Sequence, residues 1–360
     1  MTISSNSGRL PANLQYDEVD EVYDILKQRF DGELDEEKLM DGLKRGLAEA
    51  SGDNHTTYWN SKEAELNEGD LNGEFPGIGA ELEHEGGRPV VVAPIEDTPA
   101  DKAGIRSKDI IISVDGQDTG SMSLTEAVSK IRGEKGTEVK LEILREDQKI
   151  DLSIVRDIIK TETVKTKLLA EGKVGYLRLT QFGEKSFEEA KGAAQELKNK
   201  GVSSVVFDLR DNPGGSLPAS VDIAGLWLRD KTIVEQKRGG KTVDTLKSST
   251  EPVLEGVPTV VLINQGSASA SEIVAAALDD YQVAELFGET TYGKGSVQEL
   301  SRLDGGGVLK VTVARWFTPN GKNVDKEGIR PDTQISDDLN TEADEALEKA
   351  ISHLIEKAGG

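Results

Sequence analysis

Three segments of this sequence carry residue types that could act together in nucleophilic catalysis. They read DLRDNPGG at 208–215, NQGSASASEI at 264–273 and TYGKGSVQ at 291–298, and each follows a short apolar run typical of a strand. Motifs at strand ends in an α/β sheet lie along the edge where active sites are usually built. We therefore expect the three segments to meet in one site.

Ser269 is the candidate nucleophile, and it is also a candidate helix cap. Ser269 and Glu272 form the S-x-x-E pattern of a capping box directly before the apolar run that starts at Ile273. A serine at a helix N-terminus lies beside free N–H groups and the positive end of the helix dipole, which stabilise an oxyanion. The residues alone leave both roles open, and Ser267 and Ser271 are expected to support or cap.

A serine hydroxyl needs a base, and Lys294 is the best candidate for it. His55, His84 and His353 are the only histidines, and all lie away from the three segments. Gly293 and Gly295 let the backbone around the lysine fold tightly into a confined site. Because burial disfavours the ammonium form, such a lysine can be neutral enough to accept a proton. The alternative is a solvated lysine in a glycine turn.

The NPGG segment is either a simple chain reversal or a source of amide donors. Pro213 and the two glycines are typical turn residues. The backbone N–H groups of Gly214 and Gly215 could also join that of Ala270 to bind an oxyanion.

Composition excludes several other classes of function. The formal charge is −23, with 43 Lys and Arg against 66 Asp and Glu, so nucleic acid and anionic lipid would be repelled. The absence of cysteine excludes a disulfide framework, a thiolate nucleophile and a Cys-based metal site. No apolar run approaches the roughly 20 residues of a bilayer-spanning helix. We expect no metal and no cofactor.

The elements that must position these residues follow from apolar spacing. Residues 1–14 are polar and predict a flexible leader, and two amphipathic helices follow up to Leu47. Short apolar runs with glycine predict a small β-rich domain at 73–157 with one helix after Ser123. From Thr163, strands alternate with helices around 187–198, 218–228 and 271–280, before a last helix at 342–357, which predicts an α/β core with largely parallel strands.

Taken together, the three segments resemble the C-terminal processing (tail-specific) peptidases, family S41. In that family the serine of an S-A-S-E stretch is the nucleophile and a lysine 25 residues later is the base, which is the separation of Ser269 and Lys294. A glutamine four residues after the lysine helps to orient it, and Gln298 occupies that position. The resemblance implies a serine endopeptidase with polypeptide substrates, and a ββα core shared with crotonase-like proteins.

The β-rich region resembles a PDZ domain. Its PGIG segment matches the carboxylate-binding loop, so the amides of Gly77, Ile78, Gly79 and Ala80 are expected to bind a peptide C-terminus, with the peptide added as a strand. The connector departs from the family pattern, because it reads DNHTTYWN instead of a tyrosine-rich Asp-Pro-Tyr-Ser stretch. Docking of the N-terminal region on the PDZ domain is expected to differ in detail.

The fold class that we predict is α/β (α+β multidomain). Residues 1–72 form a leader and N-terminal helical region, 73–157 the PDZ domain, and 158–360 the α/β serine protease core with a C-terminal helix. The N-terminal helices are the expected surface of any homo-oligomer. The family acts mostly in the periplasm, cell envelope or thylakoid lumen, so a targeting segment absent from this chain is expected, while a cytoplasmic location stays open.

Two other functions compete with this one. GETTYGKG at 288–295 is one residue short of a phosphate-binding loop, although Gly295 replaces the hydroxyl residue that would hold magnesium. No nucleotide partner is expected. The chain could instead be a PDZ-containing scaffold with an inactive core, since fold similarity does not establish activity. The complete set of Ser269, Lys294 and Gln298 argues against that.

Overall fold

The computed structural model describes residues 16–64, 74–122, 124–160, 163–336 and 343–359. The chain divides into two compact units, residues 1–51 and residues 52–360. The expected leader at 1–14, the end of the connector at 65–72 and Glu342 at the start of the last predicted helix lie outside the described residues.

The first unit contains the two predicted helices. Helix α1 (Tyr16–Arg29) and helix α2 (Glu36–Glu49) agree with the apolar spacing of the sequence. The side chain of Asp35 caps α2 by accepting a hydrogen bond from the Lys38 amide. Several large apolar side chains of this unit are exposed, namely Val19, Val22, Ile25, Phe30, Met40, Leu43 and Leu47.

A six-stranded sheet forms the centre of the α/β core. Its strand order is β10-β11-β12-β15-β16-β19, and every neighbouring pair is parallel except β10 with β11. These strands are β10 (Val164–Leu169), β11 (Val174–Leu179), β12 (Ser204–Asp208), β15 (Thr259–Ile263), β16 (Ala284–Gly288) and β19 (Thr333–Gln334). The predicted largely parallel α/β arrangement is confirmed, and the short helix η3 (Ala170–Gly172) connects β10 to β11.

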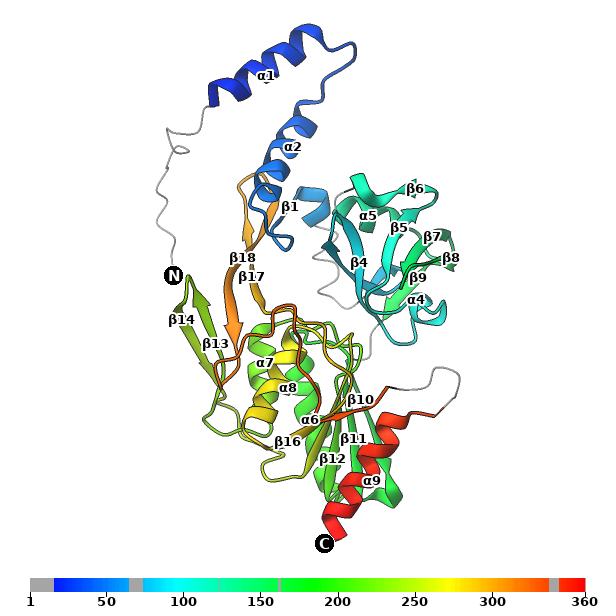
Figure 1. Cartoon of the computed structure of the whole chain (residues 1–360), viewed down its shortest axis with the longest axis vertical. Coiled ribbons are helices and arrows are strands. Elements are labelled where there is room, and N and C mark those ends of the chain that lie inside the picture. The colour runs from blue at the N-terminus through cyan, green and yellow to red at the C-terminus, as the bar shows by residue number, and fades with distance from the viewer. Residues whose placement is uncertain (1–15, 65–73, 123, 161–162, 337–342, 360) are drawn as a thin grey trace. The chain divides into compact units, whose positions relative to one another are not determined.

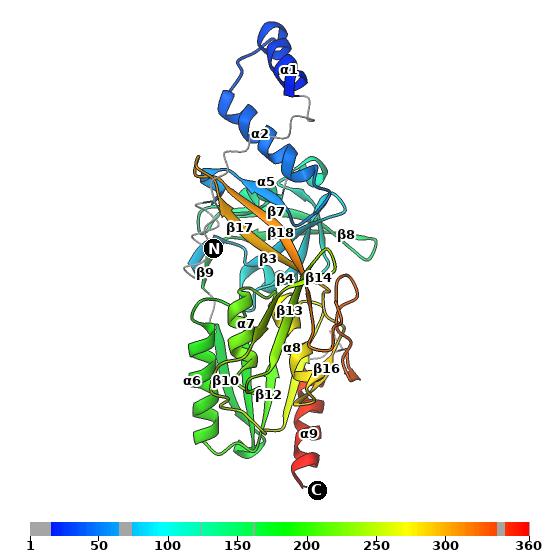
Figure 2. The ribbon, with the colours of Figure 1, turned by 90° about the vertical axis from the view of Figure 1, so that its left-hand side faces the viewer.

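Helices cover both faces of this sheet, as Figures 1 and 2 show. One face packs against α6 (Ser186–Asn199), α7 (Leu217–Ala224) and α8 (Ala270–Asp280), and the other packs against α9 (Glu345–Gly359). Successive strand residues point to opposite faces. Phe207 accordingly lies in the cluster with α7 and α8, whereas Val206 lies in the cluster with α9.

The β-rich domain, residues 74–160, is built around a sheet of order β3-β4-β5-β7-β8, with β6 paired to β5. Its elements are β2 (Glu74–Gly77), β3 (Ala80–Glu85), β4 (Arg88–Pro94), α4 (Pro99–Lys102), β5 (Ile110–Val114), β6 (Gln117–Asp118), η2 (Thr119–Ser121), α5 (Leu124–Ile131), β7 (Glu138–Arg145), β8 (Gln148–Val155) and β9 (Asp157–Lys160). Strand β2 pairs with β9, outside this sheet. Because β3 is at the sheet edge, one side of its backbone is available for an added strand.

A third sheet, which the sequence did not predict, joins the connector to the end of the core. Its order is β1-β18-β13-β14, with β17 also paired to β18. The strands are β1 (Thr57–Trp59), β13 (Thr232–Arg238), β14 (Lys241–Lys247), β17 (Ser296–Arg302) and β18 (Val308–Phe317). Strand β17 begins two residues after Lys294, so this sheet fixes the segment that carries the predicted base.

Candidate active site

The three predicted segments meet at the carboxyl ends of adjacent parallel strands. The NPGG segment follows β12, the serine segment follows β15, and the lysine segment follows β16. These strands are neighbours in the order β12-β15-β16, so their ends lie side by side. The site therefore lies at the predicted edge of the sheet.

Ser269 differs from its two serine neighbours in exposure and in backbone conformation. It is partly exposed and has a φ of 52°, an unfavourable region for a residue with a side chain. Ser267 and Ser271 are fully buried. The Ser267 hydroxyl donates to the Leu209 carbonyl at 2.8 Å, and that of Ser271 donates to the Asn212 carbonyl at 2.8 Å. Ser269 is thus the serine of this segment that a substrate can reach.

The glycines of NPGG pack directly against the serine segment. Gly214 has a φ of 104°, and a Cβ there would lie 2.7 Å from the Ala268 carbonyl oxygen and 2.9 Å from the Ala270 nitrogen. Only glycine tolerates this approach. The structure thus brings Gly214 and Ala270 together, but the Gly214 amide donates to the Asn212 side-chain oxygen at 2.9 Å. In this arrangement that predicted oxyanion donor is already engaged.

Asn212 is a residue of the site that sequence reasoning missed. Its side-chain nitrogen donates to the Leu179 carbonyl at 2.8 Å, and its own carbonyl accepts from the Ala268 amide at 3.0 Å. Asn212 therefore ties the NPGG segment both to β11 and to the serine segment. Its position before Pro213 indicates a turn, and its contacts depend on how distant segments come together.

Lys294 is buried, with 7% of its surface exposed, as predicted for a basic catalytic lysine. Its ammonium forms an ion pair with the carboxylate of Glu83, on β3 of the β-rich domain. Burial alone would lower the pKa of Lys294, but its acidic neighbours, Glu83 first and then Glu81 and Glu272, together raise the pKa above its usual value. This arrangement favours the charged form of the lysine, and its role as a neutral base stays a prediction.

Glu83 is held ionised by the same contact. It is 8% exposed, and although burial would raise its pKa, the neighbouring Lys294 together with His55 lowers it well below the usual value. The ring of His55, in the connector, lies 3.1 Å from the same carboxylate oxygen. In the sequence His55 lies away from the three segments, but the structure places it against the partner of the candidate base.

Gln298 lies on β17, four residues after Lys294, with its amide directed elsewhere. Its nitrogen donates to the Ser296 hydroxyl at 2.8 Å and to the Thr312 hydroxyl at 3.4 Å. The lysine segment is instead fixed by Trp316, whose ring nitrogen donates to the Lys294 carbonyl at 2.8 Å. The orienting role of Gln298 stays a prediction.

Comparison with known proteins shows the family. The model of peptidase family S41 matches residues 173–335, and that of the PDZ domain matches residues 90–145. Carboxy-terminal processing protease CtpA of Bacillus subtilis is 39% identical over 321 residues, which are 88% of this chain and 68% of that protein. The chain belongs to peptidase family S41. This S41 chain is therefore a serine-type peptidase with an embedded PDZ domain, as the resemblance implied.

Further relatives agree. The carboxy-terminal-processing protease of Bartonella bacilliformis is 37% identical over 89% of this S41 chain and 74% of its own length. Among solved structures, the photosystem II D1 C-terminal processing protease is 27% identical, with a TM-score of 0.78 over 93% of this chain and 90% of that one.

In the described part of this chain, no helix is long and apolar enough to cross a membrane.

The predicted carboxylate-binding loop of the PDZ domain is held by its carbonyl groups. The Ile78 carbonyl accepts from the Ala100 amide at 2.7 Å, and that of Gly79 accepts from the Ile95 amide at 2.8 Å and the Thr98 hydroxyl at 3.0 Å. Gly79 has a φ of 83°, and a Cβ there would lie 2.4 Å from the Cβ of Thr98. Glycine is therefore required at position 79 of this loop, which leads into edge strand β3.

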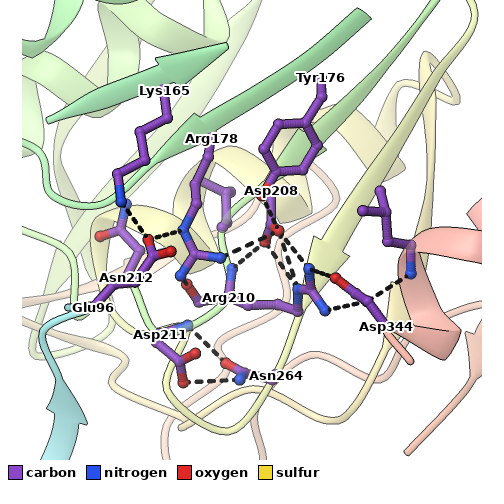
Figure 3. A network of polar contacts seen from close by, with 12 residues as sticks. Glu96, Lys165, Tyr176, Arg178, Asp208, Arg210, Asp211, Asn212, Asn264 and Asp344 are labelled. Atoms are coloured by element: carbon purple, nitrogen blue, oxygen red, sulfur yellow. Dashed lines mark hydrogen bonds and ion pairs between the residues drawn. The ribbon is translucent and has the colours of Figure 1, made fainter. Parts of the chain in front are cut away.

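Behind the NPGG segment lies a buried polar network centred on Asp208, at the end of β12 (Figure 3). The carboxylate of Asp208 is fully buried. It accepts from the Tyr176 hydroxyl at 2.8 Å and lies 2.6 Å from the Arg210 guanidinium and 3.4 Å from that of Arg178. Burial would raise the pKa of Asp208, but the two cations lower it below its usual value.

The two arginines extend this network to other parts of the chain, as Figure 3 shows. Arg210 binds Asp344, which lies one residue before α9, with both contacts at 2.8 Å. Arg178 lies 2.9 Å from Glu96 of the PDZ domain, which is also 3.2 Å from Lys165. The ion pairs of this network thus connect the core strands to the last helix and to the PDZ domain, next to the site.

Replacing Asp208 by asparagine should destabilise the chain by about 3–5 kcal/mol, because two largely buried guanidinium groups lose their carboxylate. The lowered pKa of Asp208 gives the sign of the pH dependence. The contribution of Asp208 to the free energy of unfolding is complete above the unfolded pKa of about 3.9, and it is lost as the pH falls through the lower pKa of the folded state. Urea unfolding at pH 7 and pH 3 should show the wild type and the variant converging in acid. Asp344→Asn, at a half-exposed position, should lose much less stability. Equal losses of stability in the two variants would contradict the placement of Asp208 at the centre of the network.

Proposed function

We propose that this chain is a carboxy-terminal processing serine protease that cleaves polypeptides recognised near their C-termini. The observation that carries the proposal is the conformation of Ser269, partly exposed at the N-terminus of α8 with a φ of 52°. It lies against Gly214, at the strand ends that also carry Lys294. The relatives, which are named as processing proteases, support the same substrate class.

In the proposed reaction, neutral Lys294 takes the proton of the Ser269 hydroxyl while the oxygen attacks the scissile carbonyl carbon. The amides of Ala270 and Gly215 receive the oxyanion, and that of Gly214 does so once it exchanges the Asn212 oxygen for the substrate oxygen. Lys294 then gives its proton to the leaving amine, and an acyl-enzyme remains on Ser269. Water deprotonated by the same lysine releases the acyl group, so the proposed steps use no metal and no cofactor.

The Glu83–Lys294 ion pair suggests how the PDZ domain controls this reaction. While the ion pair is formed, Lys294 stays charged and cannot act as a base. Glu83 lies on β3, the edge strand beside which a bound tail would add. We therefore propose that the PDZ domain gates the site as well as tethering the substrate, because the strand that receives the tail also holds the base.

Replacing Glu83 by glutamine should raise cleavage of a short peptide that lacks a tail for the PDZ domain, by about 5- to 150-fold. The pH at which activity appears should also fall, because Lys294 loses the charge that raises its pKa. Rates for wild type, Glu83→Gln and Glu85→Gln between pH 6 and pH 10 provide the measurement, with exposed Glu85 of the same strand as the control. A Glu83→Gln enzyme that is no faster and has an unchanged pH profile contradicts the gate.

Recognition of the tail is tested by amidation. A free C-terminal carboxylate should bind the amides of Gly77–Ala80, so amidation of the same peptide should raise KM several-fold on the full chain. Peptide cleavage followed by mass spectrometry gives the rates and the cleavage positions. Equal rates for the acid and amide peptides mean that this domain does not read tails. Binding of the tail with no cleavage at all favours the scaffold alternative.

The contacts of the lysine segment argue against the phosphate-loop alternative. The amides of Gly293 and Lys294, which would have to bind a phosphate, donate instead to the buried carboxylate of Glu272 at 2.8 and 2.9 Å. A phosphate at this position would meet an internal carboxylate. These contacts support the proposal that the segment GETTYGKG binds no nucleotide.

Three finer expectations remain proposals. The exposed apolar residues of α1 and α2 favour a homo-oligomer formed with a second copy of the chain through these helices. The boundaries 1–72, 73–157 and 158–360 remain our proposed domain division. An extracytoplasmic location is proposed from the resemblance to processing proteases.

A further inference from the structure

Glu272 occupies the junction between the serine and lysine segments. Its side chain is completely buried in the first turn of α8. As the capping-box pattern predicts, one carboxylate oxygen accepts a hydrogen bond from the Ser269 amide at 2.9 Å. A cap of this kind needs only that contact, since its role is to satisfy a free amide at the helix start.

The carboxylate makes three further contacts that a helix cap does not require. The oxygen that accepts from Ser269 also accepts from the Lys294 amide at 2.9 Å. The other oxygen accepts from the Gly293 amide at 2.8 Å and from the Thr291 hydroxyl at 2.5 Å. All four partners donate, so this pocket is built for an ionised carboxylate. Burial nevertheless raises the pKa of Glu272, against the effect of the four donors.

We propose that Glu272 is a positioning residue that fixes the distance and orientation between the Ser269 nucleophile and the Lys294 base. One oxygen holds the backbone of both residues, although they are 25 positions apart in the chain. The inference rests on the proposed roles of these two residues. A misplacement of about 1 Å in such a pair can reduce the rate roughly 100-fold, so a shared anchor on a rigid helix has a direct effect on turnover.

Glu272 also contributes its negative charge to the surroundings of Lys294. The charged groups that face this lysine are Glu81 and Glu83 from β3, Glu272 from α8 and Lys310 from β18, with His55 against Glu83. The carboxylate of Glu272 stabilises the ammonium form of the lysine. Removal of its charge should therefore move the alkaline rise of activity toward lower pH, which loss of packing alone would not do.

The test compares three variants of the full chain. Glu272→Gln keeps the shape but turns one acceptor into a donor that faces donors; kcat should fall roughly 100-fold and the pH midpoint should move to lower pH. Glu272→Asp keeps the charge but cannot reach all four donors, so its rate should fall without a shift of the midpoint. Thr291→Val removes one donor and leaves the charge of Glu272, so its loss of kcat should be the smallest of the three.

Three measurements separate the outcomes: kcat and KM against pH with a short peptide, the thermal midpoint, and the rate at which a fluorophosphonate labels Ser269. If Glu272→Gln does not fold, Glu272→Asp carries the test. The positioning role is overturned if the variants that fold keep the wild-type kcat and show no shift in the pH midpoint of activity. A wild type that the probe does not label at Ser269 overturns the proposed nucleophile instead, so the two failures are distinguishable.

Discussion

Replacing Ser269 by alanine should abolish proteolysis, with a fall in kcat on the order of 10⁶-fold, as for other serine peptidases that lose their nucleophile. The variant should still fold, because the Glu272 carboxylate accepts from the backbone amide of residue 269 and not from its side chain. Rates of cleavage of an unfolded protein with an apolar C-terminus, together with the thermal midpoint, provide the measurement.

Ser267 and Ser271 are the matched controls for this prediction. Each is fully buried and donates its hydroxyl to a carbonyl of the NPGG side of the site. Alanine at either position should reduce stability by about 1 kcal/mol and leave most of the activity. A dead Ser267→Ala or Ser271→Ala enzyme beside an active Ser269→Ala enzyme would show that the nucleophile has been assigned to the wrong serine.

Replacing Lys294 by arginine should reduce kcat by about 10²–10⁴-fold, because guanidinium stays protonated and cannot accept the hydroxyl proton. The positive charge opposite Glu83 is kept, so the ion pair and the PDZ contact need not be lost. Because its acidic neighbours raise the pKa of Lys294 above its usual value, the wild-type rate should climb on the alkaline side as the lysine loses its proton. The measurement is kcat against pH for both enzymes, with Gln298→Ala expected to be milder than Lys294→Arg.

Lys310 provides the decisive control. It lies on β18 close enough for its charge to be felt by Lys294, and burial followed by the charge of Lys294 lowers its pKa, so it is the competing candidate for a basic lysine. Lys310→Arg should keep most of the turnover. If Lys310→Arg were inactive and Lys294→Arg active, the base would have to be reassigned to β18.

Most of the core could be predicted because its signals are local. The runs VGYLRL, SVVFDL and TVVLIN are apolar and β-branched, and each became a buried strand of the parallel sheet. The separation of Ser269 and Lys294 matched the pattern of the family that the chain resembles, and the position of both segments after strands indicated that they share one edge of the sheet. The capping-box pattern of Ser269 and Glu272 before an apolar run also predicted the start of α8, although not the φ of 52° at Ser269.

The contacts that control the site could not be predicted because they join distant segments. Glu83 lies in a strand whose acidic residues look like an ordinary solvated face, and only the packing of the PDZ domain on the core brings it to Lys294. His55 came from a connector that departs from the family pattern. Glu272 was predicted as a cap, but its contact with the lysine segment depends on how α8 and the end of β16 meet.

The central claim, that Ser269 carries the acyl group and Lys294 creates the nucleophile, is tested most directly by trapping the intermediate. The full chain is mixed with an activated peptide ester, quenched in acid within one turnover, and digested for mapping by mass spectrometry. We predict an acyl adduct on the peptide that contains Ser269, formed faster as the pH rises and reduced strongly in Lys294→Arg. Complete hydrolysis with no adduct, or an adduct at Ser267 or Ser271, would contradict this account.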